Sequence, residues 1–343
     1  MLYEPNFSGE PAPGPFADGP DRKIFRFTYR GAPQPLRSYL LQRYAFGRDA
    51  QWRESFYPGR VRLNGGPVEA GTAVAPGDRL QYLHLRSEEP SPPALDPPLY
   101  EDHWIVVLNK PDTIPVNPSG VYYFTCLALL AREVLGYPSM SPLHRLDLET
   151  AGPVIFAKRA GEARHFHRLF EEHRIEKRYR ALVHGAFPAT TRELRGCIVP
   201  HPDSAILTKL ALAADGPGRQ TITRVIAVER RGEFSEVELE PVTGRTNQLR
   251  VQLAAAGHPI VGDKKYHPDE GVFLDWLEHR DFERLRARLL LPRQALLCER
   301  LSFTHPFTGR PLTLQAPAGA WRRKTAGLDA VTGGHRPPGG ARL

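Results

Sequence analysis

The stretch Pro142-Leu-His-Arg-Leu-Asp-Leu-Glu-Thr-Ala-Gly152 runs directly into the apolar segment Pro153-Val-Ile-Phe-Ala157. The apolar segment is typical of a buried strand, and the polar residues before it are typical of a turn. A turn beside a buried strand can present a side chain in a cleft, so Asp147 is a candidate catalytic group. The alternative is that Asp147 only caps the turn or pairs with Arg145.

Patterns on either side of this stretch predict the fold. Further strands are expected at residues 104–108, 179–184, 221–228 and 234–240, where residues alternate or are β-branched. Helices are expected at residues 121–135, 163–173 and 247–256, and a surface helix with alternating charges at 275–291. Strands outnumber helices, which predicts an α+β fold: a mostly antiparallel mixed sheet with helices packed on it.

Composition limits the class of protein. Hydrophobic residues make up 41% of the 343 residues, which is too many for a wholly disordered chain. No apolar run reaches the ~20 residues of a membrane helix, and the N-terminus has no signal-peptide pattern, so a cytoplasmic protein is expected. The three cysteines are far apart, which excludes a disulfide framework. The formal charge of +8 favours a polyanionic partner such as nucleic acid.

The chain is expected to contain two domains between loose ends. Residues 1–22 and 319–343 are rich in Pro and Gly and are predicted to be disordered tails. Residues 87–98 carry many prolines and are predicted to form the linker. Residues 23–86 are then expected to form a small domain with a helix, a strand, a tight turn and a second strand, whose excess of arginines predicts nucleic-acid binding. Residues 99–318 are expected to form the large domain.

Two later segments add candidate site residues. Residues 177–183 alternate as a strand and place Lys177 and Tyr179 on one face. The segment Thr243-Gly-Arg-Thr-Asn-Gln-Leu-Arg250 reads as a turn that enters a helix, with Arg250 in its first turn. Taken alone, Tyr179 could be a core residue and Arg250 a surface residue.

Together these motifs resemble the RluA-type pseudouridine synthases. The resemblance runs from residue 99 to residue 317, in the family's order: Asn109-Lys-Pro111, the His-Arg-Leu-Asp block, the Lys-x-Tyr-x-Ala strand, the Gly-Arg-Thr-x-Gln-Leu-Arg helix, Gly257-His-Pro-Ile-Val-Gly-Asp263 and Leu301-x-Phe-x-His-Pro306. Residues 36–85 resemble the small alpha-L RNA-binding domain, on the basis of Gly59-Arg-Val-Arg-Leu-Asn-Gly65 and Gly77-Asp78.

The resemblance implies an isomerase that converts uridine in ribosomal or transfer RNA to pseudouridine, without metal or cofactor. Asp147 matches the essential aspartate, which acts as nucleophile or as base, and both routes need a carboxylate. Arg250 matches the arginine that pairs with it, and Tyr179 matches a tyrosine that stacks on uracil and helps remove the proton on ring carbon five. Arg145 matches a residue that fills the space left by the flipped base. Expected further contacts are Leu249, Lys177 and Arg245 for the substrate, and Arg37, Arg60, Arg62 and Lys110 for RNA.

Three positions depart from the family pattern. Ala151 stands where Ser is usual, Asn247 stands where His is usual, and Leu148 occupies a variable position that is often Arg. His144 is expected to be a hydrogen-bonded framework residue. Two alternatives stay open at this point, a catalytically silent RNA-binding factor on the same fold and a metal-dependent nuclease. A monomer is expected.

Overall fold

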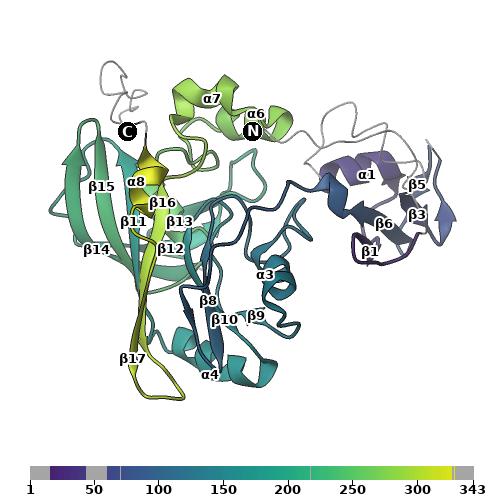
Figure 1. The fold of residues 1–343 in the computed structure, drawn as a ribbon. Helices are drawn as coiled ribbons and strands as arrows, with labels where there is room; N and C mark the ends of the chain where they lie inside the picture. The colour runs from purple at the N-terminus through teal and green to yellow at the C-terminus, as the bar shows by residue number, and fades with distance from the viewer. Residues whose placement is uncertain (1–15, 44–59, 70, 217, 327, 329–343) are drawn as a thin grey trace.

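The computed structural model describes residues 16–43, 60–69, 71–216, 218–326 and 328. They form a small N-terminal unit and a larger unit that contains two sheets (Figure 1). The α+β class predicted from the sequence is confirmed, because nearly all strand pairing is antiparallel and helices lie against the sheets. No helix in the described ranges is long and apolar enough to cross a membrane.

The N-terminal unit is an antiparallel sheet in the order β1-β6-β3-β4 with a helix packed on it. Its elements are β1 (Arg22–Thr28), β3 (Val61–Leu63), β4 (Gly66–Pro67), β6 (Arg79–Leu85) and α1 (Leu36–Arg43), beside the pair β2 (Gln34–Pro35) and β5 (Ala73–Val74). The predicted helix and strands are therefore present. Of the predicted N-terminal tail, Phe16 already packs on Ile24 and Leu83, and residues 1–15 lie outside the described residues.

A tight turn closes the β3-β4 hairpin. Asn64 and Gly65 both have positive φ, 52° and 90°, as the favoured two-residue hairpin turn requires. The Asn64 side chain also donates to Asp78 Oδ1 at 2.8 Å and accepts from the Arg79 N–H at 2.9 Å. Asn64 and Asp78, which belong to the two short sequence motifs of this unit, thus lie together at one corner of the sheet.

The larger unit combines a four-stranded and a seven-stranded sheet. The first has the order β7-β8-β10-β9 and the second the order β13-β12-β14-β15-β11-β16-β17. The strands are β7 (Tyr100–Glu101), β8 (Ile105–Lys110), β9 (Ser141–Pro142), β10 (Gly152–Ala157), β11 (Glu176–His184), β12 (Glu193–Pro200), β13 (Leu210–Ala213), β14 (Arg219–Arg231), β15 (Phe234–Pro241), β16 (Leu296–Thr304) and β17 (Pro311–Gln315). The helices are α3 (Leu127–Leu135), α4 (Ala160–Glu171), α5 (Gln248–Ala255), α6 (Gly271–His279), α7 (Phe282–Leu289) and α8 (Ala320–Thr325).

The two sheets meet where β10 begins. The Cys298 N–H of β16 donates to the Ala151 carbonyl oxygen at 2.9 Å. Gly152 has a φ of 130°, and a Cβ there would collide with the Cys298 carbonyl oxygen. Only glycine allows so close an approach. The contact between Gly152 and Cys298 fixes the end of residues 142–152, which carry Asp147.

Two helix predictions need correction. The helix expected at residues 121–135 begins only at Leu127. The single helix expected at residues 275–291 is two helices, α6 and α7. Arg280 ends α6 in the left-handed region with φ 54°, and Asp281 caps α7 by accepting from the Glu283 N–H.

The basic tail predicted from residue 319 is wrong for its first part. Residues 320–325 form α8, whose Trp321 is buried. The Lys324 side chain is only 5% exposed, and its Nζ donates to Asp112 Oδ2 at 2.5 Å and to the Glu149 carbonyl oxygen at 3.0 Å. The helix forms because tertiary partners compensate for a composition that favours disorder. Residues 329–343 lie outside the described residues.

The predicted linker is anchored at its start. Glu89 lies just after the 3₁₀ helix η1 (Arg86–Glu88), and its buried carboxylate accepts from the backbone N–H groups of residues 123–125 at 2.6–2.9 Å. His84 Nε2 of β6 lies 2.7 Å from the same carboxylate. Burial alone would raise the pKa of Glu89, but these hydrogen bonds hold it below its usual value. The carboxylate therefore joins the N-terminal unit to the loop before α3.

Replacement of Glu89 tests this joint. Glu89→Ala leaves three N–H groups without their acceptor and should lower the free energy of unfolding by about 3 kcal/mol. The control is Glu133→Ala, which removes an exposed carboxylate that pairs with Arg86 and should cost less than about 1 kcal/mol. Urea denaturation measures both, and equal losses would contradict the assignment.

Candidate active site

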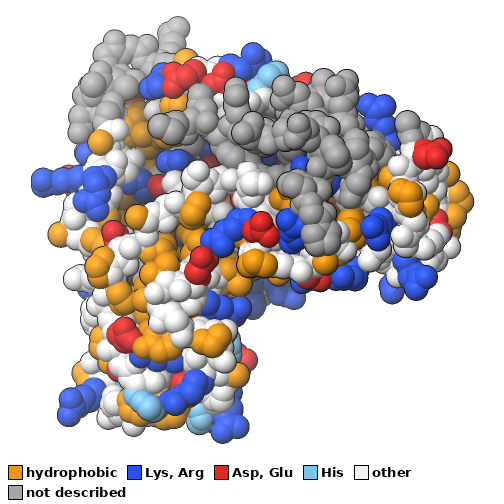
Figure 2. All heavy atoms as spheres, turned by 45° about the vertical axis from the view of Figure 1, so that its right-hand side comes forward, with side chains coloured by type: hydrophobic (Ala, Val, Ile, Leu, Met, Phe, Trp, Pro, Cys, Tyr) orange, Lys and Arg blue, Asp and Glu red, His pale blue; other side chains and the backbone are white. Residues whose placement is uncertain are grey.

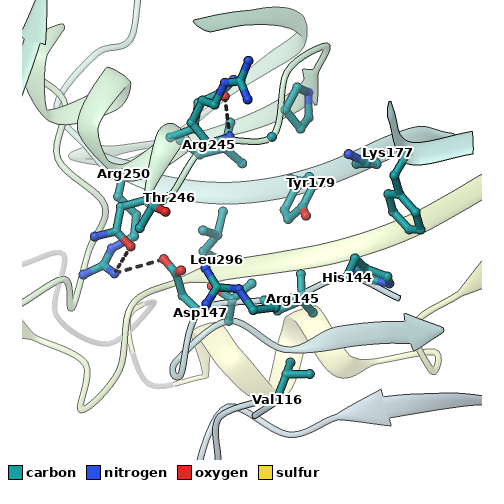
Figure 3. Close-up of a pocket in the computed structure, with 18 of the residues that line it drawn as sticks. Val116, His144, Arg145, Asp147, Lys177, Tyr179, Arg245, Thr246, Arg250 and Leu296 are labelled. Atoms are coloured by element: carbon teal, nitrogen blue, oxygen red, sulfur yellow. Dashed lines mark hydrogen bonds and ion pairs between the residues drawn. The ribbon is translucent and has the colours of Figure 1, made fainter. Parts of the chain in front are cut away.

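A cavity of about 890 Å³ lies between the two sheets. Its lining comes from segments far apart in the chain: residues 115–119 and 143–150, the end of α4, β11, and residues 241–250 that lead into α5. Asp147, Tyr179, Arg145, Lys177, Arg245, Leu249 and Arg250, which the sequence singled out, all line it. Figure 3 shows Asp147 at one end, Tyr179 in the middle, and Lys177 and His144 at the other end.

An ion-pair network surrounds Arg250. Its Nη1 donates to Asp147 Oδ2 at 3.0 Å, while its Nε and Nη2 donate to the two oxygens of Asp263 at 2.6 and 2.8 Å. Burial alone would lower the pKa of Arg250, but the two carboxylates raise it well above its usual value. Asp263 is fully buried, whereas the Asp147 side chain is 30% exposed. Asp263 therefore fixes the guanidinium, and Asp147 faces the cavity.

Asp263 and Tyr266 were missed as functional residues. Asp263 ends a motif that was recognised, but nothing in the sequence assigned it a role. Its Oδ1 also accepts from the N–H groups of Lys265 and Tyr266, at 3.1 Å each. The available signal was an aspartate directly after Gly262 in this motif, but neither its burial nor its partner on α5 could be read from the sequence.

Asn247 contacts the catalytic candidate directly. Its backbone is left-handed, with φ 55°, a conformation that asparagine tolerates. Its hydrogen bonds are satisfied when Nδ2 faces Asp147, donating to Oδ2 at 3.0 Å and Oδ1 at 3.2 Å, and Oδ1 accepts from the Tyr266 hydroxyl at 3.0 Å. Burial raises the pKa of Tyr266, which keeps this hydroxyl protonated. The residue that departs from the family pattern thus orients Asp147.

Tyr179 forms the centre of the cavity wall. It lies on β11 opposite Cys298 of β16. Burial, with a smaller contribution from Cys298, raises the pKa of Tyr179 well above its usual value. The side chain is thus a neutral phenol at neutral pH, with an aromatic face and a hydroxyl group available to a ligand.

The remaining cavity residues divide into framework and rim. His144 is confirmed as framework: its Nε2 accepts from the Ile155 N–H at 3.1 Å, and burial lowers its pKa to about 3. Leu249 is 6% exposed and gives the cavity an apolar surface. Arg145 and Arg245 are exposed at the rim. No described carboxylate forms an ion pair with Arg145, so the alternative pairing with Asp147 is absent from the described structure.

Two predicted RNA contacts are in the interior. Lys110 is fully buried, and its Nζ donates to the carbonyl oxygens of Pro111, Ile114 and Leu148 at 2.7–2.8 Å. Burial lowers its pKa to about 7. Arg60 is only 5% exposed. The prediction that these two residues contact RNA was wrong, because charge alone does not reveal which basic residues are enclosed. Arg37 is exposed, and the guanidinium of half-buried Arg62 lies 4.2 Å from the centre of the Phe16 ring.

The chain is similar in sequence to known proteins. Residues 104–255 match a family model described as RNA pseudouridylate synthase. The chain is 32% identical over 287 residues to "Ribosomal large subunit pseudouridine synthase D" of Neisseria meningitidis, covering 81% of this chain and 73% of the relative. The chain belongs to the RNA pseudouridylate synthase family.

Two further comparisons agree with this family. "Dual-specificity RNA pseudouridine synthase RluA" of Pasteurella multocida is 32% identical over 231 residues, which are 66% of this chain and 95% of the relative. The solved structure "Human RNA Pseudouridylate Synthase Domain Containing 1" has the same fold, with a TM-score of 0.52 at 24% identity over 67% of this chain and 86% of that one. The RluA-type resemblance is confirmed, and the alpha-L resemblance of residues 36–85 stays a prediction. No group of three or more His, Cys, Asp or Glu residues in the described ranges could hold a metal ion.

Asn247→Gly tests the contact with Asp147. Glycine adopts the left-handed backbone without strain, so this change removes only the side chain. Loss of a hydrogen bond to a carboxylate should lower kcat for RNA about tenfold. Thermal unfolding and single-turnover kinetics measure stability and rate separately. An unchanged kcat, or a loss explained by unfolding, would contradict the role of Asn247.

Proposed function

We propose that this synthase isomerises uridines in ribosomal or transfer RNA to pseudouridine and that Asp147 is its catalytic residue. The observation that carries the proposal is the Asp147 carboxylate, which faces the cavity and is held by an arginine that a second, buried aspartate fixes. The relatives add support, because their names describe synthases acting on large-subunit RNA or with dual RNA specificity.

The reaction is an internal exchange of bonds. Asp147 either attacks the ribose carbon C1′ or removes a proton from the ribose to give a glycal intermediate, and in both routes the bond from C1′ to the ring nitrogen breaks. The uracil then rotates, and its carbon five bonds to C1′. The proton on carbon five is lost while the ring nitrogen gains one, so the atoms balance. Arg250 and Asn247 keep Asp147 aimed at the ribose.

Tyr179 is proposed to hold the uracil. Its ring lies at the centre of the cavity, where a base can stack on it. Its raised pKa means that the neutral phenol must give up its own proton before it can take the one on carbon five. Stacking and a hydrogen bond to the base are therefore its first role, and proton removal is a later step in which it takes part.

The target uridine must leave its helix to reach this cavity. Arg145 is exposed at the rim beside Asp147. We propose that its side chain fills the space in the RNA helix that the extruded base leaves. Leu249 supplies an apolar contact, and Arg245 supplies positive charge at the opposite rim. Because these groups contact a single extruded nucleotide, recognition of the surrounding RNA must come from elsewhere on the protein.

The N-terminal unit is proposed to bind that surrounding RNA. Figure 2 shows Lys and Arg side chains on this unit as well as on the larger one. Exposed Arg37 and half-buried Arg62 belong to it, and Glu89 joins it to the catalytic unit. RNA that binds to both units would span the Glu89 contact between them.

Asp147→Asn tests the activity. The wild-type enzyme should release tritium from RNA that carries uridine labelled at ring carbon five, and the variant should release none, because an amide can neither attack nor accept the proton. The RNA is total RNA from cells that lack the protein. Release by neither protein would favour the silent RNA-binding alternative, and equal release by both would assign the chemistry to another residue.

Arg37→Ala combined with Arg62→Ala tests the RNA-binding role of the N-terminal unit. Loss of two phosphate contacts should reduce the slope of log affinity against log salt by about 1–2, while kcat at saturating RNA stays unchanged. The matched control, Arg159→Ala with Arg164→Ala, removes the same charge at the start of α4. Filter binding at several salt concentrations gives the slope, and equal slopes for the two double variants would contradict the proposal.

A further inference from the structure

Lys177 extends into the cavity from β11. It lies two residues before Tyr179 and on the same face of the strand. Its Nζ lies 5.4 Å from the centre of the Phe170 ring, and a Cβ built on Gly244 would lie 3.5 Å from it. The ammonium therefore reaches across the cavity, from the wall formed by α4 to the loop before α5. Figure 3 shows it pointing inward beside Tyr179.

This ammonium has no counterion in the described structure. No described carboxylate lies within ion-pair distance of it, although Glu171 lines the same cavity. Burial lowers the pKa of Lys177. The neighbouring Cys298 supplies no charge at neutral pH, because burial raises the pKa of its thiol to about 12. A half-buried cation without a counterion can bind an incoming anion.

Other enclosed lysines of the larger unit differ from Lys177. Lys110 donates to three carbonyl oxygens. Lys264 donates to Glu149 and to a carbonyl oxygen, and Lys324 donates to Asp112 and to another carbonyl oxygen. These three lysines hold the protein framework together. Lys177 shows no such bond, and its place in the wall of the reaction cavity gives it access to a ligand.

The wall opposite Lys177 is rigid. Gln248 Oε1 accepts from the Thr243 hydroxyl at 2.8 Å and from the Arg245 N–H at 3.1 Å, while its Nε2 donates to Thr223 Oγ1 at 2.9 Å. These bonds fix the loop on both sides of Gly244, which itself has no side chain to fill the space. The Lys177 ammonium therefore lies between Phe170 and a loop that is held in place by hydrogen bonds.

We propose that Lys177 binds a backbone phosphate that flanks the target uridine. This assignment rests on the proposed function. It adds that the enzyme recognises one phosphate of the RNA backbone. The cavity, at about 890 Å³, is near the upper end for small-ligand sites, so it has room for more than a nucleoside. Phosphate is the anionic group that an RNA chain carries on either side of each nucleoside.

The test compares uridine with uridine 3′-monophosphate and uridine 5′-monophosphate, titrated by ligand-observed NMR. The wild-type protein should bind one of the monophosphates at least about tenfold more tightly than uridine. Lys177→Met should lose this preference and bind all three compounds alike, while Lys177→Arg should keep most of it. The control is Lys158→Met, which removes the same charge at a lysine paired with Glu101 outside the cavity, and should keep the wild-type preference.

A second measurement separates this inference from the proposed function. Tritium release by Lys177→Met should show a raised KM for RNA and a nearly unchanged kcat, whereas Asp147→Asn shows no release. No release by the wild-type protein would overturn the proposed function. Release by the wild type, together with a phosphate preference that persists in Lys177→Met, would overturn the phosphate assignment alone. Equal or undetectable binding of uridine and both monophosphates by the wild type would also overturn the assignment.

Discussion

The site depends on one guanidinium held between two carboxylates. Arg250 makes two hydrogen bonds to buried Asp263 and one to Asp147. The bidentate contact uses the planar geometry of arginine, which a lysine could not reproduce. Asp263 holds the Arg250 guanidinium in place, and the guanidinium orients one side of the Asp147 carboxylate. The other side of this carboxylate faces the cavity. An enclosed charge network of this kind is costly unless every member is paired, which explains why the surrounding groups are so fully hydrogen-bonded.

The loop that carries Asp147 is held by the framework on both sides. Lys110 donates to the Leu148 carbonyl oxygen, and Lys264 and Lys324 both donate to Glu149. These lysines come from β8, from the turn after Asp263 and from α8, so three separate parts of the chain hold one short loop. Gly152 then locks the loop against β16. Such support restricts the motion of Asp147, and the proposed reaction requires its carboxylate to be placed accurately.

The cavity combines a charged end, an aromatic middle and a cationic end. Asp147 and Arg250 occupy the first, Tyr179 the second and Lys177 the third. In the proposed substrate complex, Asp147 faces the ribose, Tyr179 stacks on the base, and Lys177 binds a phosphate carried by the ribose. Glu89, outside the cavity, joins the N-terminal unit to the loop before α3. In the proposed function, the arrangement couples a surface for surrounding RNA to a pocket for one extruded nucleotide.

The sequence by itself determined the α+β class and the buried strands, because alternation is a local property of the chain. Its short motifs also singled out Asp147, Tyr179 and Arg250, which line one cavity. Tertiary structure alone decided which charges are enclosed. Lys110 and Arg60 are basic residues like Arg37, yet they are buried, and residues 320–325 form a helix only against distant partners. The roles of Asp263 and Glu89 likewise depend on groups that lie near them only after folding. Burial and pairing are set by segments far apart in the sequence, so local patterns cannot encode them.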